Sequence, residues 1–190
     1  MQDNFSPQQS LALIQSMIVR AKSDLNQNRI YFLLWGWITF TAILVQFILK
    51  VAMSYPQHYL VWLITIPAVI ITIFYAKKHQ REDHHRTYIG DSMGFLWMGI
   101  GISFFILVFI ISNSIGWLHA WPFMILMYGL GTFVSGKILQ FKPLVVGGIF
   151  NWVLACACTF FNYDYQILFA AAAILTSYII PGHLLRKNNK

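Results

Sequence analysis

The chain has 190 residues, of which 58% are hydrophobic and only 10% are charged. Soluble domains carry roughly 25% charged residues, so this composition excludes an ordinary soluble domain and indicates an integral membrane protein. The formal net charge of +7 is informative only through the positions of the basic residues.

The N-terminal segment, residues 1–28, is mostly polar and predicts an amphipathic helix. A capping-box arrangement opens it at Ser6. Leu11, Ile14 and Ile18 then recur at spacings of three and four, which places them on one face of a helix. We expect this helix to lie along the inner leaflet, to pack beneath the bundle, or to dock a cytoplasmic partner.

Six apolar segments follow, each close to the roughly 20 residues that cross about 30 Å of hydrocarbon. Short stretches with charge or helix-breaking residues separate them. The predicted spans are 30–49, 59–76, 93–112, 118–136, 144–161 and 166–185. The fold class is therefore all-α and polytopic, with an N-terminal amphipathic helix over 1–28 and one six-helix bundle over 29–190.

Basic residues are divided unequally between the two sides of these spans. Twelve of the thirteen lysines and arginines fall on one side, and Lys50 alone falls on the other. Because cytoplasmic loops hold the excess of basic residues, both termini are predicted to be cytoplasmic. Trp62, Trp121 and Tyr163 lie near the predicted outer interface, where aromatic residues serve as anchors.

The run KKHQREDHHR, residues 77–86, forms the predicted cytoplasmic turn between the second and third spans. Its basic residues follow from this position, and Glu82 has helical ion-pair spacing to cations on both sides. His79, His84 and His85 lack a specific ligand spacing, and four cations oppose a metal, so no metal site is predicted. We expect a partner-docking surface in which these histidines respond to pH. Its candidate residues are Leu11, Ile14, Ile18, His79, Glu82, His84 and His85.

Polar residues inside the spans are few, and no Asp, Glu, Lys, Arg or His lies deep in any of them. This argues against a proton-coupled pump or an ion-selective pore. Asn151 and Gln46 are the deepest amides, and Asn151 is expected to find a hydrogen-bond partner across the bundle. Pro67 is expected to kink the second span. Gln46, Pro67 and Asn151 are the candidate intramembrane polar and kink site, although plain packing also explains each of them.

Small residues four positions apart predict where helices approach closely. The pairs are Gly99 with Ser103, Gly131 with Ser135, Thr132 with Gly136, and Ala173 with Ser177.

Four segments carry a family resemblance: FLLWGWITF, GFLWMGIGISFFIL, YGLGTFVSGKILQFKPLVVGGIFNW and SYIIPGHLLR. Together they resemble a largely uncharacterised family of small six-span membrane proteins of Bacteroidota, over about residues 21–186. The resemblance implies a bacterial inner-membrane location. It also implies a regulatory role, by association with winged-helix regulators encoded nearby, and it supplies no catalytic residues.

No set of positioned acids, bases, nucleophiles or metal ligands can be assembled, so an enzyme is not expected and no cofactor is predicted. We expect a non-enzymatic sensor, regulatory or scaffold protein of the inner membrane. Its partners would be the lipid bilayer and a cytoplasmic regulatory protein, without direct nucleic-acid binding. The alternative is a transporter or channel for a neutral or lipidic small molecule, which Pro67 and Asn151 motivate.

Overall fold

The computed structural model describes residues 29–82 and 88–187, and within them all regular structure is helical. The first helix covers residues 29–47 and continues into a π-helical turn. The further elements are η1 (Ile48–Ala52), η2 (His58–Ile64), α2 (Thr65–Glu82), α3 (Tyr88–Ile110), η3 (Ile111–Ile115), η4 (Trp117–His119), α4 (Ala120–Ile138), α5 (Lys142–Cys158), α6 (Tyr163–Ile174), η5 (Leu175–Ile179) and α7 (Ile180–Lys187).

Several continuous helical segments are long and apolar enough to cross a membrane, which confirms the predicted all-α polytopic fold. Among the described residues there are five: Arg29–Ala52, His58–Tyr75, Gly90–Ser114, Trp117–Ile138 and Tyr163–Leu184. The remaining apolar helix, Lys142–Cys158, has 17 residues and is about 25 Å long, slightly less than the thickness of the hydrocarbon. The predicted boundaries agree with these segments to within a few residues.

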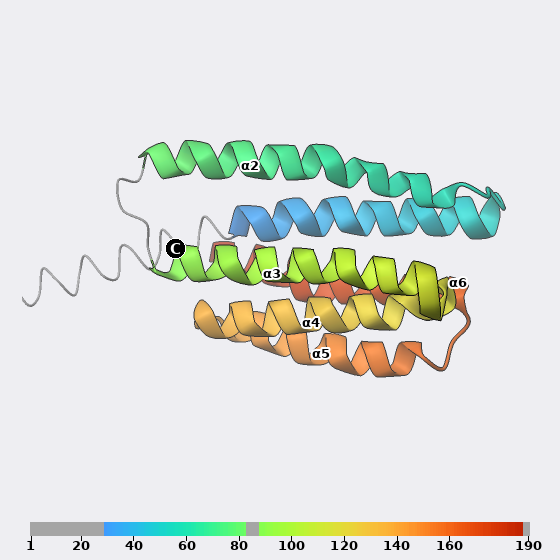
Figure 1. The fold of residues 1–190 in the computed structure, drawn as a ribbon. Coiled ribbons are helices and arrows are strands. Elements are labelled where there is room, and N and C mark those ends of the chain that lie inside the picture. Colours follow the sequence, from blue (N-terminus) through green and yellow to red (C-terminus); the bar gives the residue numbers. More distant parts are fainter. Residues whose placement is uncertain (1–28, 83–87, 188–190) are drawn as a thin grey trace, which may run out of the picture.

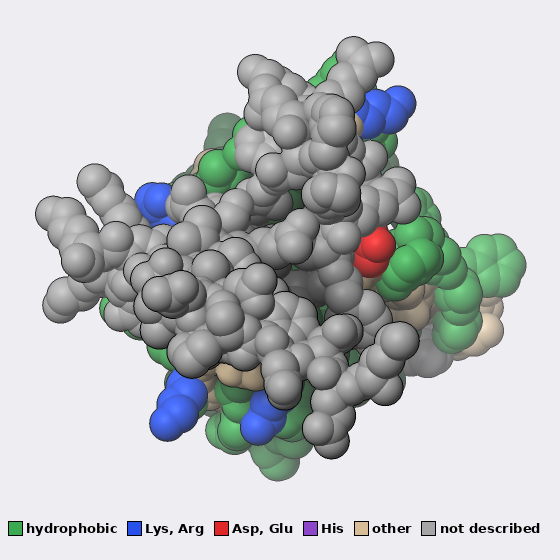
Figure 2. Space-filling model, turned by 90° about the vertical axis from the view of Figure 1, so that its left-hand side faces the viewer, with side chains coloured by type: hydrophobic (Ala, Val, Ile, Leu, Met, Phe, Trp, Pro, Cys, Tyr) green, Lys and Arg blue, Asp and Glu red, His purple; other side chains and the backbone are tan. Residues whose placement is uncertain are grey.

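The helices run alternately in opposite directions, so the described chain begins and ends at the same end of the bundle (Figure 1). We call this the terminal end and the opposite one the Lys50 end. Lys and Arg side chains surround the face seen from the terminal end (Figure 2). Lys77, Lys137 and Lys142 belong to this end by their positions in α2, α4 and α5. The division of basic residues read from the sequence is therefore present in the fold, while its orientation in the membrane stays a prediction.

The α4–α5 pair forms the tightest contact of the bundle and is built on glycines. A Cβ added at Gly136 would lie 2.6 Å from the backbone nitrogen of Val145, and one at Gly148 would lie 2.8 Å from the carbonyl oxygen of Gly129. Only glycine allows backbones to approach this closely. A turn of three residues joins the two helices, with Gln140 in the left-handed region at φ 51°. This short turn fixes α4 and α5 as antiparallel neighbours.

Burial separates central helices from peripheral ones. Within an apolar 18-residue stretch of each span, the share of buried residues is 44% in Trp117–Ile138 and 56% in Tyr163–Leu184, but 11% in Gly90–Ser114 and 6% in His58–Tyr75. Figure 1 shows α2 along one side of the Arg29–Ala52 helix, with the other helices beyond it. The hydrogen bond from Trp35 Nε1 to Thr72 Oγ1, 3.1 Å long, joins this pair. The second span therefore lies at the edge of the bundle, beside the first span.

Three of the four predicted small-residue pairs lie at buried positions. Their members are Gly131, Thr132, Ser135, Gly136, Ala173 and Ser177. The fourth pair, Gly99 and Ser103, is exposed, and a Cβ at Gly99 would meet no atom within 4 Å. The prediction was wrong for this pair because a spacing of four does not say which way the helix face points.

Pro67 does not interrupt the second span as predicted. It lies in the first turn of α2, where a missing N–H costs little, and the seven residues before α2 form the 3-10 helix η2. The irregular part of the span therefore precedes the proline. The Pro67 side chain is exposed on the bundle surface.

Candidate functional site

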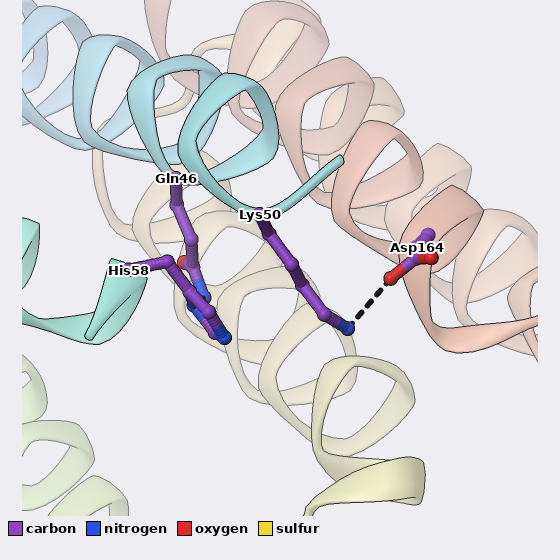
Figure 3. A network of polar contacts seen from close by, with 4 residues as sticks. All are labelled: Gln46, Lys50, His58 and Asp164. Atoms are coloured by element: carbon purple, nitrogen blue, oxygen red, sulfur yellow. Dashed lines mark hydrogen bonds and ion pairs between the residues drawn. The ribbon is translucent and has the colours of Figure 1, made fainter. Parts of the chain in front are cut away.

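A polar cluster lies at the Lys50 end, where the first helix meets the starts of the second and last spans (Figure 3). We define it by Gln46, Lys50, His58, Trp62 and Asp164 and call it the Lys50 cluster. Its residues come from three separate spans. The cluster therefore holds together segments that are distant in the sequence.

One half of the cluster is an ion pair. Lys50 Nζ, in the π-helical turn η1, lies 2.6 Å from Oδ1 of Asp164 in the first turn of α6. The same ammonium group lies 3.7 Å from the centre of the Tyr163 ring, within the range of a cation–π contact. The only basic residue predicted on this side thus has its charge balanced, and it links the first span to the last.

The other half is centred on Gln46, whose side chain is buried one helical turn before Lys50. Trp62 Nε1 donates a 2.7 Å hydrogen bond to Gln46 Oε1. Gln46 Nε2 lies 3.3 Å from His58 Nδ1. Since an amide nitrogen can only donate, His58 Nδ1 accepts, and the neutral ring carries its proton on Nε2. Both ends of the Gln46 amide are therefore satisfied, and the amide fastens η2 to the first helix.

Trp62 extends the cluster toward the centre of the bundle. Its ring centre lies 6.2 Å from that of Trp121 at the start of α4, at an interplanar angle of 43°. The sequence identified Trp62 and Trp121 only as interface anchors. Their pairing depends on how two helices are rotated toward each other, which no spacing within one helix reveals.

A second set of polar groups lies in the middle of the bundle. The Thr132 hydroxyl donates a 2.7 Å hydrogen bond to the backbone carbonyl of Tyr128, one helical turn before it. The rings of Tyr128 and Tyr178 meet edge to face at 5.7 Å, and Trp97 packs on Tyr178 at 5.8 Å. The sequence identified Thr132 only as a small residue and missed both tyrosines, although a tyrosine far from the membrane interface is itself a signal.

Asn151, at mid-length in α5, is completely buried. Its Cβ lies 3.1 Å from the position that a Cβ on Gly129 would take, so the side chain sits in the α4–α5 contact. Among the described residues neither its Oδ1 nor its Nδ2 has a hydrogen-bond partner. The prediction that Asn151 finds a hydrogen-bond partner across the bundle is therefore wrong for this structure.

Gln46, Pro67 and Asn151 do not form a single site. Gln46 connects through Trp62 to the start of α4, whereas Asn151 contacts α4 at Gly129, about 12 Å further along the helix. Pro67 faces outward from α2. The candidate intramembrane site is thus three separate features, of which only Gln46 belongs to the Lys50 cluster.

The predicted docking residues fall largely outside the described structure. Leu11, Ile14, Ile18, His84 and His85 lie outside the described residues. His79 and Glu82 belong to the last turns of α2, where only the backbone is described. The docking surface therefore stays a prediction.

The Lys50 cluster contains an ion pair, an amide and an imidazole, but no nucleophile with an adjacent base. Within the described residues, no three His, Cys, Asp or Glu side chains lie close enough together to hold a metal ion. The cluster joins the spans to one another through hydrogen bonds and an ion pair.

Comparison with known proteins adds no relative: no family model, no curated protein and no solved structure matches the chain. The resemblance to the Bacteroidota family therefore stays a prediction.

Proposed function

We propose that the protein is a non-enzymatic membrane sensor, regulatory or scaffold protein. In this proposal α2 responds to the surrounding lipid, and residues 1–28 and 77–86 dock a cytoplasmic regulatory protein. The observation that carries it is the burial of only 6% of the His58–Tyr75 span. A span so exposed contacts mostly lipid, and its tilt therefore follows the thickness and composition of the bilayer.

Directional side-chain contacts join α2 to the first helix. They include the Trp35–Thr72 hydrogen bond and the Tyr31–Tyr75 ring contact at 5.6 Å, together with the Lys50 cluster at the start of the span. Such directional side-chain contacts limit the motion of α2 less than backbone packing does. Tilting α2 is therefore the least costly rearrangement that the fold offers.

The position of α2 also connects this motion to the predicted docking surface. The helix continues without a break to Glu82, well into the 77–86 run. The first helix begins at Arg29, directly after the predicted amphipathic segment. A change in the angle between these two helices would move both predicted docking elements relative to each other, which is how lipid would control a partner.

Distance measurements between spin labels test the sensing step. We would place labels at Ile71→Cys on α2 and Leu126→Cys on α4, with Cys156→Ser and Cys158→Ala, in thin and thick phosphatidylcholine bilayers. We expect the distance to change by about 2–3 Å, because α2 tilts by several degrees. A control pair on α4 and α5, Leu130→Cys with Val153→Cys, should stay constant. Equal behaviour of the two pairs would contradict the sensing role.

Photo-crosslinking in native membranes tests the docking step. A crosslinking amino acid at Ile14 or His84 should capture the same cytoplasmic protein, and Leu11→Gln should abolish capture. The same amino acid at Met53, which is exposed at the Lys50 end, serves as the control. Capture of that protein from Met53, or from neither docking position, would refute the docking surface.

The orientation and the membrane are part of the proposal, supported by the unequal distribution of lysine and arginine. An impermeant thiol reagent applied to intact bacterial cells should label Met53→Cys and leave Gln140→Cys unlabelled. The reverse pattern would invert the topology.

The alternative, a transporter or channel for a neutral or lipidic small molecule, was motivated by Pro67 and Asn151. Pro67 faces outward and Asn151 is enclosed between α4 and α5. These separate positions favour the sensor.

A further inference from the structure

A groove of about 450 Å³ lies between α5 and the last span, in the half of the bundle next to the terminal end. We propose that it binds one anionic phospholipid, with an acyl chain in the groove and the headgroup phosphate on Lys142. This site is on other helices than α2. It goes beyond the proposed sensing role and does not depend on it.

The groove exists because two backbones meet at its floor. A Cβ at Gly147 would lie 2.9 Å from the carbonyl oxygen of Thr176 and 3.0 Å from the Cα of Ser177, so no side chain fits between α5 and η5. The π-helical turn η5 ends at Ile179, two residues before Pro181, which cannot donate a backbone hydrogen bond. The last span is therefore irregular where the glycine passes, and the hollow remains beside the contact.

The walls of the groove are apolar and face outward. Val146 is 64% exposed, and Phe150 and Ile180 are also exposed along the rim. Thr176, the hydroxyl-bearing residue of the wall, donates its hydroxyl back to the carbonyl of Ala172 at 2.9 Å. The wall therefore offers an occupant no free hydroxyl, and a hydrocarbon chain is the ligand that it suits.

The length of the groove matches one leaflet. It extends along α5 over the nine residues from Lys142 to Phe150, a rise of about 12 Å. Half of the hydrocarbon core is about 15 Å thick. A chain lying in the groove with its headgroup at Lys142 would thus run from the interface nearly to the middle of the bilayer.

Charge selects the headgroup. Lys142 is exposed at the mouth of the groove and makes no ion pair with any residue that the structure describes. It is also the first residue of α5, where the positive end of the helix dipole adds to its charge. A phospholipid whose headgroup has a net negative charge complements this mouth better than a zwitterionic phospholipid does.

Native mass spectrometry of the purified full-length chain tests the site. The probes are phosphatidylglycerol and phosphatidylcholine with identical acyl chains, and inorganic phosphate as a separate competitor. We expect one tightly bound phosphatidylglycerol, with about fivefold preference over phosphatidylcholine, because one lysine near a membrane surface contributes about that factor. Inorganic phosphate should not displace it, since the acyl chain contributes most of the binding.

Matched variants separate the two parts of the site. Lys142→Ala should remove the preference for phosphatidylglycerol, whereas Lys137→Ala, at the same end but outside the groove, should keep it. Val146→Trp should fill the groove and weaken both lipids, whereas Val153→Trp, seven residues further along α5, should weaken neither. Thermal melts check the fold, and Ile180→Trp replaces Val146→Trp if that variant unfolds.

Four results would overturn the proposal: equal binding of the two lipids by the unchanged chain, equal losses for Lys142→Ala and Lys137→Ala, unchanged binding in a folded groove-filling variant, or displacement of the lipid by inorganic phosphate. Displacement by inorganic phosphate would show an ion site in place of a lipid site. None of these outcomes bears on the tilt of α2, so the proposed function is tested separately.

Discussion

The α4–α5 pair and the pair formed by α2 with the first helix are held by different means. Glycines bring the backbones of α4 and α5 together, whereas α2 is attached through the side chains of Trp35, Thr72 and the Lys50 cluster. Backbone contact leaves a helix no room to move without losing many contacts at once. Side-chain contacts can be lost one at a time. The bundle therefore combines a fixed centre with a movable edge.

The largest effect is expected from adding one methyl group to the fixed pair. Gly148→Ala would place a Cβ 2.7 Å from the backbone nitrogen of Phe133, which cannot move away alone. We expect the free energy of unfolding to fall by about 2–3 kcal/mol, because overpacking a core is destabilising by amounts of this size. Titration with sodium dodecyl sulfate in mixed micelles would measure it.

Gly99→Ala is the matched control, because a Cβ there meets nothing within 4 Å. Its unfolding free energy should change by less than about 0.5 kcal/mol, as at other surface positions. If both glycine variants behave alike, the close backbone approach at Gly148 does not hold α4 and α5 together.

The next prediction concerns Asn151, the polar group inside the fixed pair. Its amide is buried without a partner, which is costly, so Asn151→Leu should raise the free energy of unfolding by about 1–2 kcal/mol. The same titration measures it, with Asn113→Leu at an exposed position as the control. A loss of stability in Asn151→Leu would instead show that the amide has a partner in the membrane, such as a bound water.

At the movable edge, Gln46→Leu removes the group that fastens η2 to the first helix. Trp62 Nε1 and His58 Nδ1 would both lose their partner, and we expect a loss of about 1 kcal/mol. Hydrogen exchange should become faster in α2 and stay unchanged in α4. Gln57→Leu, at an exposed neighbouring position, should alter neither. Faster exchange across the whole bundle would mean that α2 is not an independent edge.

Much of the fold follows from the sequence because a membrane imposes long apolar segments and an unequal distribution of basic residues. The six apolar helices could be predicted without any knowledge of the contacts between them. The contacts themselves depend on helix rotation, which the weak amphipathicity of lipid-exposed spans does not encode. Gly131 was therefore correctly assigned to a helix contact and Gly99 was not, although both belong to pairs of the same spacing.

The candidate site was predictable only in part for the same reason. Gln46 could be found because a buried amide is rare in a span, but its partners Trp62 and His58 come from another segment. Asp164 was overlooked, since a carboxylate in a short loop is ordinary until a lysine is seen 2.6 Å away. Asn151 was found by the same logic as Gln46, yet its environment differs completely.

The smallest effect is expected where the movable edge is connected to the centre, at the ion pair of Lys50 and Asp164. The side chains are 27% and 49% exposed, so their attraction is weakened by the surroundings. A double-mutant cycle of Lys50→Met and Asp164→Asn should give a coupling of about 0.2–1 kcal/mol at low salt and less at high salt. The control cycle of Lys142→Met with Asp164→Asn, at opposite ends, should give none. A coupling that is large and insensitive to salt would mean that the pair is shielded from water. The first helix would then belong to the fixed centre. Among the described residues, α2 alone would then form the movable edge.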